Sequence, residues 1–218
     1  MRLLILGATG PTGILLVREA LAAFEATLIL YVRSPAKIPD DLSSNPQTIV
    51  IQGQLDDLDG LSKAMEGVDV VLSALGPSQF SQPSGTPLAH AYERIIETMQ
   101  RHQVDRLIAL GTASIGAPED KFNLTYSLMV KSVSISMRNA YKDILAIAAV
   151  IQASNLDWTI VRVPILSNDT SRDVIVGYIG DGKTKNTVTL SRLGFAAFVV
   201  EEVTKKQWHR KLPLLVSA

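Results

Sequence analysis

Three regularly spaced glycines, Gly7, Gly10 and Gly13, are the residues of this sequence that most directly indicate chemistry. An apolar run precedes them, and a helical pattern over Ile14–Ala23 follows. Such a turn bends the chain sharply, lets the backbone approach a pyrophosphate and packs the helix tightly on the strand. Backbone N–H groups at the helix start then face the anion, aided by the helix dipole. The spacing therefore predicts a dinucleotide site.

The side chains of the turn fit the same interpretation. Thr9 and Thr12 can donate hydroxyl hydrogen bonds to phosphate oxygens, and Pro11 lies between them within the predicted site. The alternative is a glycine-rich turn that binds no ligand. We favour the binding site because the turn follows a buried strand, opens a helix and begins a β-α-β unit.

A basic cluster after the second apolar run indicates which dinucleotide binds. Thr27–Val32 reads as a strand, and Arg33, Ser34 and Lys37 follow it. In dinucleotide-binding folds an acidic residue at this point prefers the free 2′-hydroxyl of NAD, whereas an arginine accommodates the 2′-phosphate of NADP. The guanidinium can pair with phosphate in a bidentate manner. We predict NADP(H); the alternative is that these are solvated loop cations.

The elements that must position these residues alternate between short apolar runs and longer helical patterns. Strands are predicted over Leu3–Leu6, Thr27–Val32, Thr48–Gln52, Val70–Ala74, Arg106–Leu110, Thr159–Val163 and Leu212–Val216. Helices are predicted over Thr12–Ala23, Leu58–Glu66, Pro87–His102, Val133–Ser154 and Ser191–Thr204. The alternation predicts an α/β fold with a Rossmann-type doubly wound parallel sheet, as a single domain over residues 1–218.

Three stretches that interrupt this alternation are predicted to form substrate loops, at 77–87, 116–130 and 165–187. The first two follow predicted strands, at the carboxyl edge where open α/β sheets bind ligands. Four aromatic residues in these loops are candidates for substrate contact: Phe80, Phe122, Tyr126 and Tyr178. Their character favours a flat or hydrophobic substrate over a small sugar or acid.

Composition excludes several other classes of site. The 218 residues carry a formal net charge of +0 and no cysteine, so nothing indicates a nucleic-acid surface, a disulfide or a thiolate nucleophile. His90, His102 and His209 lack metal-ligand spacing, and we expect no metal. No apolar run is long enough for a membrane span. We expect a cytoplasmic protein whose partner is a small-molecule substrate.

Several longer segments carry a family resemblance: LILGATGPTG, VRSPAKI, GQLDDLDGLSKAMEGVDVVLSALG, SNLDWTIVRVP and LSRLGFAAFVVEEV. The sequence resembles the atypical short-chain dehydrogenase/reductases, in the NmrA-like NAD(P)-binding group that includes biliverdin-IXβ/flavin reductase. The resemblance implies a Rossmann fold, NADP(H) as cofactor, and a cytosolic monomer or weak dimer.

The resemblance also implies cofactor contacts at the carboxyl ends of later strands: Gln54, Leu55, Ala74, Leu75, Gly76, Thr112, Val163, Pro164 and Ile165. Gln54 and Leu55 match the positions beside the adenine, although the family usually has aspartate where this chain has Gln54. An amide can still donate to and accept from an adenine edge. Asp143 matches a recurring aspartate of the biliverdin/flavin reductase branch.

The residues that would supply a proton are less clearly marked. Many short-chain dehydrogenases use a Tyr-x-x-x-Lys pair, but Tyr141 is followed four residues later by Leu145, and Tyr126 by Val130. Thr112, Tyr141, water or a loop group remain candidates for the proton donor. Hydride transfer can proceed without the pair, because the cofactor carries the chemistry and the protein supplies orientation.

Three functions stay open. The first is an NADPH-dependent reductase of a flavin, a quinone or a secondary-metabolite carbonyl, imine or enone. The second is an NADP(H)-sensing regulator of the NmrA type that does not turn the cofactor over. The third is a cofactor-dependent biosynthetic enzyme that performs no net redox chemistry. Because one fold supports many functions, the site must decide among them.

Overall fold

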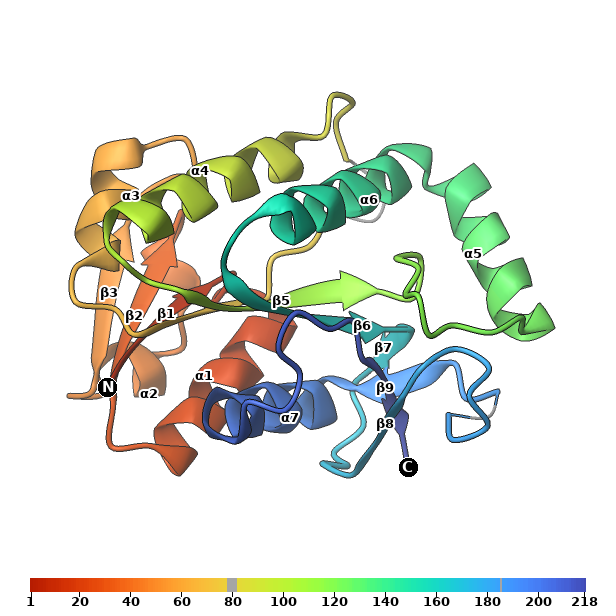
Figure 1. The fold of residues 1–218 in the computed structure, drawn as a ribbon. Helices are drawn as coiled ribbons and strands as arrows, with labels where there is room; N and C mark the ends of the chain where they lie inside the picture. Colours follow the sequence, from red (N-terminus) through yellow and green to blue (C-terminus); the bar gives the residue numbers. More distant parts are fainter. Residues whose placement is uncertain (78–81, 185) are drawn as a thin grey trace.

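An eight-stranded sheet forms the centre of the protein (Figure 1). The computed structural model describes residues 1–77, 82–184 and 186–218. Neighbouring strands follow the order β3-β2-β1-β4-β5-β6-β10-β8, and only the last pair is antiparallel. The strands are β1 (Arg2–Leu6), β2 (Thr27–Val32), β3 (Thr48–Gln52), β4 (Val70–Ser73), β5 (Arg106–Thr112), β6 (Asp157–Val163), β8 (Val174–Gly177) and β10 (Leu214–Ser217). A separate two-stranded parallel ribbon joins β7 (Ile165–Ser167) to β9 (Thr189–Ser191).

Helices cover both faces of the sheet, as Figure 1 shows. One face carries α1 (Pro11–Ala23) and α7 (Arg192–Lys205), and the other carries α3 (Leu58–Met65), α4 (Pro87–Arg101) and α6 (Arg138–Ala153). Alternate residues of β1 enter opposite core clusters, Leu3 and Ile5 on the first face and Leu4 and Leu6 on the second. The predicted Rossmann-type doubly wound fold is therefore confirmed.

The smaller helices lie around this framework. They are the 3-10 turn η1 (Pro35–Lys37), α2 (Asp40–Ser43) and α5 (Leu124–Ser136). Among the described residues, no helix combines the length and the apolar character needed to cross a membrane. In Figure 1, α5 lies at one end of the molecule and follows the long connection from β5.

The predicted elements are present, and most differ from the observed ones by a residue or two at their ends. The largest difference is the helix predicted over Val133–Ser154, which is wrong. The chain forms two helices, α5 and α6, separated at Met137, where the backbone has φ −129° and ψ 46°. No glycine or proline marks this break in the sequence.

The range 116–130, expected to be a substrate loop, is also partly helical. It is irregular only as far as Asn123, whose side chain accepts the N–H of Tyr126 at 3.1 Å and caps α5. Asparagine favours this position because its oxygen satisfies an N–H that has no partner within the helix. Nearly half of the predicted loop, residues 124–130, therefore forms about the first two turns of α5.

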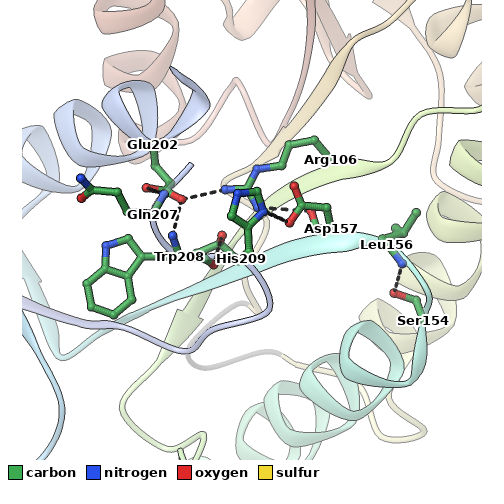
Figure 2. Close-up of polar contacts among 9 residues, drawn as sticks. Arg106, Ser154, Leu156, Asp157, Glu202, Gln207, Trp208 and His209 are labelled. Atoms are coloured by element: carbon green, nitrogen blue, oxygen red, sulfur yellow. Dashed lines mark hydrogen bonds and ion pairs between the residues drawn. The ribbon is translucent and has the colours of Figure 1, made fainter. Parts of the chain in front are cut away.

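A buried ion-pair network closes the amino edge of the sheet (Figure 2). The guanidinium of Arg106, at the start of β5, donates to Glu202 of α7 at 2.9 Å and to the Asp157 carboxylate at 3.3 Å. Glu202 also accepts the backbone N–H of Trp208 at 2.8 Å, and His209 lies 2.5 Å from Asp157. Burial lowers the pKa of Arg106, and the two carboxylates oppose this shift. The network joins α7 and the following turn to two central strands.

This network should contribute strongly to stability, because removal of one partner leaves a buried charge unpaired. We expect Glu202→Ala to lower the free energy of unfolding by about 3–5 kcal/mol in urea denaturation. The matched control is Glu201→Ala on the same helix, whose carboxylate pairs with Lys205 at the exposed surface. It should cost less than about 1 kcal/mol. Equal losses in the two variants would contradict a structural role for the buried network.

Candidate functional site

The glycine-rich turn contains two positions where the protein itself leaves no room for a side chain. Gly7 has φ +78°, and a Cβ there would lie 2.9 Å from the carbonyl carbon of Ala74 at the end of β4. A Cβ on Gly13 would lie 2.1 Å from the Gly7 carbonyl oxygen. Gly10 differs, because its Cβ would meet no atom closer than 3.5 Å, an ordinary contact. A ligand that approaches the backbone closely explains a glycine at this third position.

The start of α1 offers unpaired donors to an anion. Gly10 is the N-cap and has no side chain to accept a hydrogen bond, and Pro11 at the first helical position has no N–H. Within the described part of the chain, the N–H groups of Thr12 and Gly13 have no acceptor, and the first turn contains no acidic residue. These donors and the helix dipole fit a diphosphate.

A cavity of about 630 Å³ opens beside this turn. It brings together half of the predicted cofactor residues: Gly7, Thr9, Arg33, Ser34, Lys37, Gln54, Leu55, Leu75 and Gly76. These residues come from the ends of β1, β2, β3 and β4 and from the turns that follow. The cavity therefore lies at the carboxyl edge of the parallel strands, where ligands bind in open α/β sheets.

The α4 wall of the cavity was predicted from the sequence only in part, because the expected substrate loop at 77–87 contains its first residues but not those further along α4. It consists of the first turns of α4 and the segment before them: Gln82, Pro83, Pro87, Leu88, His90, Ala91 and Arg94. Only tertiary packing brings this helix over the turn after β1. The sequence does contain a weak signal for this wall, because the spacing of Pro87, Ala91 and Arg94 places them on one face of a helix.

The basic end of the cavity is formed by Arg33, Ser34 and Lys37. In the part of the chain that the structure describes, neither Arg33 nor Lys37 has an ion-pair partner. A smaller hollow of about 280 Å³ adjoins the same arginine and is lined by Asp56 and Asp57. The two cations and the Ser34 hydroxyl could together bind a phosphate group.

Tyr31 supports the part of the cavity where the resemblance places adenine, and sequence reasoning missed it. Its hydroxyl donates to the Gln54 carbonyl at 2.8 Å. Burial raises the pKa of Tyr31 to about 12, so the hydroxyl keeps its proton at neutral pH. A Cβ on Gly53 would lie 2.2 Å from this hydroxyl, so only glycine fits between them. Tyr31 therefore fixes the backbone that presents Gln54 and Leu55.

Asp143 of α6 holds the α4 wall in place. Its carboxylate is fully buried and accepts the N–H groups of Leu88 at 3.2 Å and Ala89 at 2.9 Å. It also accepts the side-chain amide of Gln82. The N-cap of α4, Thr86, makes no side-chain cap of its own. Asp143 thus caps α4 from a neighbouring helix, and it lies behind the cavity wall rather than on its surface.

The residues expected at the nicotinamide end lie together but outside the cavity. Thr112 and Val163 are paired neighbours at the ends of β5 and β6. The Thr112 hydroxyl accepts the N–H of Ser114 at 3.2 Å, which leaves its own proton free. Pro164 and Ile165 follow directly, and Ile165 is 57% exposed. Tyr141, on α6, makes no side-chain hydrogen bond with the described residues and does not line the cavity.

The aromatic candidates do not form one surface in the described structure. Phe80 lies outside the described residues. Phe122 is 83% exposed, whereas Tyr126 is buried and donates its hydroxyl to a backbone carbonyl at 2.6 Å. Tyr178 packs edge-on against Trp208 with ring centroids 6.1 Å apart. Its ring centroid lies 5.9 Å from the guanidinium carbon of Arg162 on β6, and Tyr178 does not line the cavity.

A second buried ion pair joins two of the loops near this edge. Arg162 on β6 is fully buried and donates to both carboxylate oxygens of Asp120, at 2.6 and 2.8 Å. Asp120 also accepts the N–H groups of Ala117 at 2.8 Å and Ile179 at 2.9 Å. These contacts tie the segment after β5 to the segment after β8.

Comparison with known proteins agrees with this geometry. Residues 7–206 match the family described as NAD(P)H-binding, and the chain belongs to that family. It is 27% identical over 212 residues to the oxidoreductase aflX of Aspergillus parasiticus, covering 92% of this chain and 76% of that protein.

Solved structures share the fold along almost the whole chain. A short-chain dehydrogenase/reductase from Veillonella parvula, solved in complex with NADP, has 21% identity and a TM-score of 0.79 and covers 99% of this chain and 94% of its own. ChuY, an anaerobillin reductase from Escherichia coli O157:H7, has 16% identity and a TM-score of 0.75, with 100% and 97% covered. The predicted membership of an NAD(P)-binding family is confirmed.

The three glycines should respond differently to an added methyl group. Gly10→Ala should leave thermal unfolding nearly unchanged, because its Cβ makes only an ordinary contact, but weaken NADPH binding about 10-fold or more, equivalent to about 1.4 kcal/mol. Gly13→Ala should itself destabilise the fold by about 1–3 kcal/mol through overpacking. Fluorescence titration and thermal unfolding measure the two effects. NADPH affinity unchanged in Gly10→Ala would argue against a phosphate at this turn.

Proposed function

We propose that this protein is an NADPH-dependent oxidoreductase that transfers a hydride to a hydrophobic or aromatic acceptor. The observation that carries the proposal is that Arg33, Ser34 and Lys37 line the same cavity as Gly7 and Thr9. One cavity thus combines a diphosphate-binding turn with a cluster suited to a 2′-phosphate. The NADP bound to the Veillonella protein and the oxidoreductase name of the Aspergillus relative also support it.

The proposed cofactor contacts follow from the chemistry of each residue. The N–H groups of Thr12 and Gly13 would bind the diphosphate, helped by the Thr9 hydroxyl. Arg33 would bind the 2′-phosphate in a bidentate manner, with Ser34 and Lys37 beside it. The remaining proposed contacts lie at the adenine, the ribose and the nicotinamide: Gln54, Leu55, Ala74, Leu75, Gly76, Thr112, Val163, Pro164 and Ile165.

The bound dinucleotide would supply the hydride, and the chain's own residues would orient the reactants and supply or relay a proton. Thr112 is placed for this role at the end of β5, because its hydroxyl accepts a hydrogen bond from Ser114 and retains a proton to donate. Water or Tyr141 are the alternative donors. The exposed apolar side chains of Ile165 and Phe122 favour a hydrophobic acceptor such as a flavin, a quinone or a secondary-metabolite carbonyl, imine or enone.

A second candidate function is an NADP(H)-sensing regulator without turnover. Its specific support is that neither Tyr126 nor Tyr141 is followed by a lysine four residues later. A site that lacks the usual tyrosine acid could bind the dinucleotide and change the exposure of a neighbouring surface without transferring hydride. The two candidates share the cofactor site and differ only in whether an acceptor is reduced.

Substitution of Arg33 tests the cofactor assignment. Arg33→Ala should weaken NADPH binding about 10- to 100-fold, because a hydrogen bond to a charged group contributes about 1.5–3 kcal/mol, and should leave NADH binding unchanged. Calorimetric titration with both dinucleotides measures the difference. The control is Arg18→Ala, whose guanidinium pairs with Asp41 and does not line the cavity. Equal weakening of NADPH and NADH by Arg33→Ala would refute the preference for NADP(H).

Turnover separates the reductase from the regulator. We expect steady NADPH oxidation with at least one flavin, quinone or redox-dye acceptor. Thr112→Val should then reduce kcat about 100-fold or more, the usual contribution of a general acid, and should weaken NADPH binding by a smaller factor because Thr112 is also a proposed cofactor contact. Tyr141→Phe is the parallel variant for the other candidate donor. Tight NADPH binding with no turnover across a broad acceptor panel would instead favour the regulator.

A further inference from the structure

Arg94 is a cation that lines the cofactor cavity from α4, whereas Arg33 lines it from the turn after β2. It lies on α4 and is partly buried where it lines the cavity. Among the described residues its guanidinium has no ion-pair partner. An acid is available one turn further along the helix, but Glu97 pairs with Arg101 at 2.5 Å. Arg94 is thus held at the cavity without a protein partner to neutralise it.

Apolar side chains line the cavity together with Arg94, and the carboxylate in the lining, Asp56, forms no ion pair with Arg94 in the described structure. Ala91 lies one turn earlier on the same face of α4, and Leu55 and Leu75 line the same cavity. Leu55 and Leu75 also pack against the core cluster that contains Tyr92 and Ile95 of α4. Apolar walls with one guanidinium suit a flat heteroaromatic ring, because arginine stacks on such rings and donates in the ring plane. The unpaired N–H donors for phosphates lie instead at the start of α1.

The helix that carries Arg94 is held rigidly. Asp143 binds the N–H groups of Leu88 and Ala89, about two turns before Arg94 along the helix. An arginine presented from a fixed helix loses less conformational entropy on contact with a ligand than one presented from a loop. The α4 wall can therefore contribute to the affinity for a ligand as well as to the shape of the cavity.

We infer that Arg94 contacts the adenine ring of the bound dinucleotide and so contributes to affinity for NADPH and NADH alike. The inference rests on the proposed dinucleotide site, and it assigns Arg94 a role different from that of Arg33. Arg33 distinguishes the two dinucleotides at the 2′-phosphate, whereas Arg94 binds the base that they share. Adenine is then enclosed between the turn after β3 and the face of α4.

The test is a set of binding titrations with NADPH, NADH and 5′-AMP on wild type and three variants. Arg94→Gln should weaken all three ligands by the same factor, about 5- to 30-fold, as expected for loss of a desolvated stacking contact. Arg94→Lys keeps the positive charge but lacks the planar guanidinium, so its binding of all three ligands should remain weaker than that of wild type. Arg18→Gln is the control, because Arg18 pairs with Asp41 and does not line the cavity, and it should bind like wild type. Thermal unfolding confirms that each variant is folded.

Several outcomes would overturn the inference. Loss of NADPH affinity alone in Arg94→Gln would place Arg94 at the 2′-phosphate. Full recovery in Arg94→Lys would indicate attraction by charge rather than contact with a ring. No difference between Arg94→Gln and Arg18→Gln would remove Arg94 from the site, while NADPH binding by wild type would leave the proposed function intact. Failure of wild type to bind either dinucleotide would overturn the proposed function itself.

Discussion

The close approach between the turn after β1 and the end of β4 is the constraint on which the site depends. A side chain at Gly7 would press on the Ala74 backbone, and one at Gly13 would press on Gly7. Because neither can be accommodated, α1 starts directly against the sheet edge, and the N–H groups of its first turn keep no acceptor among the described residues. The cavity lies beside this turn, where the connections after β1 and β4 lead to helices on opposite faces of the sheet.

Charges in this protein fall into two groups with different roles. Arg106 and Arg162 are buried and paired with carboxylates, and they join strands, helix α7 and loops into one framework. Arg33, Lys37 and Arg94 line the cavity and have no ion-pair partners among the described residues. The chain has a formal net charge of +0, yet the lining of this cavity contains these three cations and one carboxylate, Asp56. A dinucleotide with several phosphates matches this distribution.

Local sequence patterns predicted the features that depend on local geometry. The order of the central strands and helices, the phosphate turn and the position of Arg33 all follow from residues close together in the chain. The features that could not be predicted from the sequence depend on tertiary contacts. The α4 wall is held by Asp143 from another helix, and Tyr178 packs against Trp208 and Arg162 instead of lining the cavity. The break between α5 and α6 at Met137 could not be predicted, because no glycine or proline lies there in the sequence.

A crystal structure of the complex with NADP⁺ would test the cofactor assignment most directly. We expect the 2′-phosphate within about 3 Å of the Arg33 guanidinium, the usual hydrogen-bond distance, and the diphosphate at the N–H groups of Thr12 and Gly13. The adenine should lie between Leu55 and Arg94. A 2′-phosphate directed into solvent, or NADP⁺ bound outside this cavity, would contradict the proposed site.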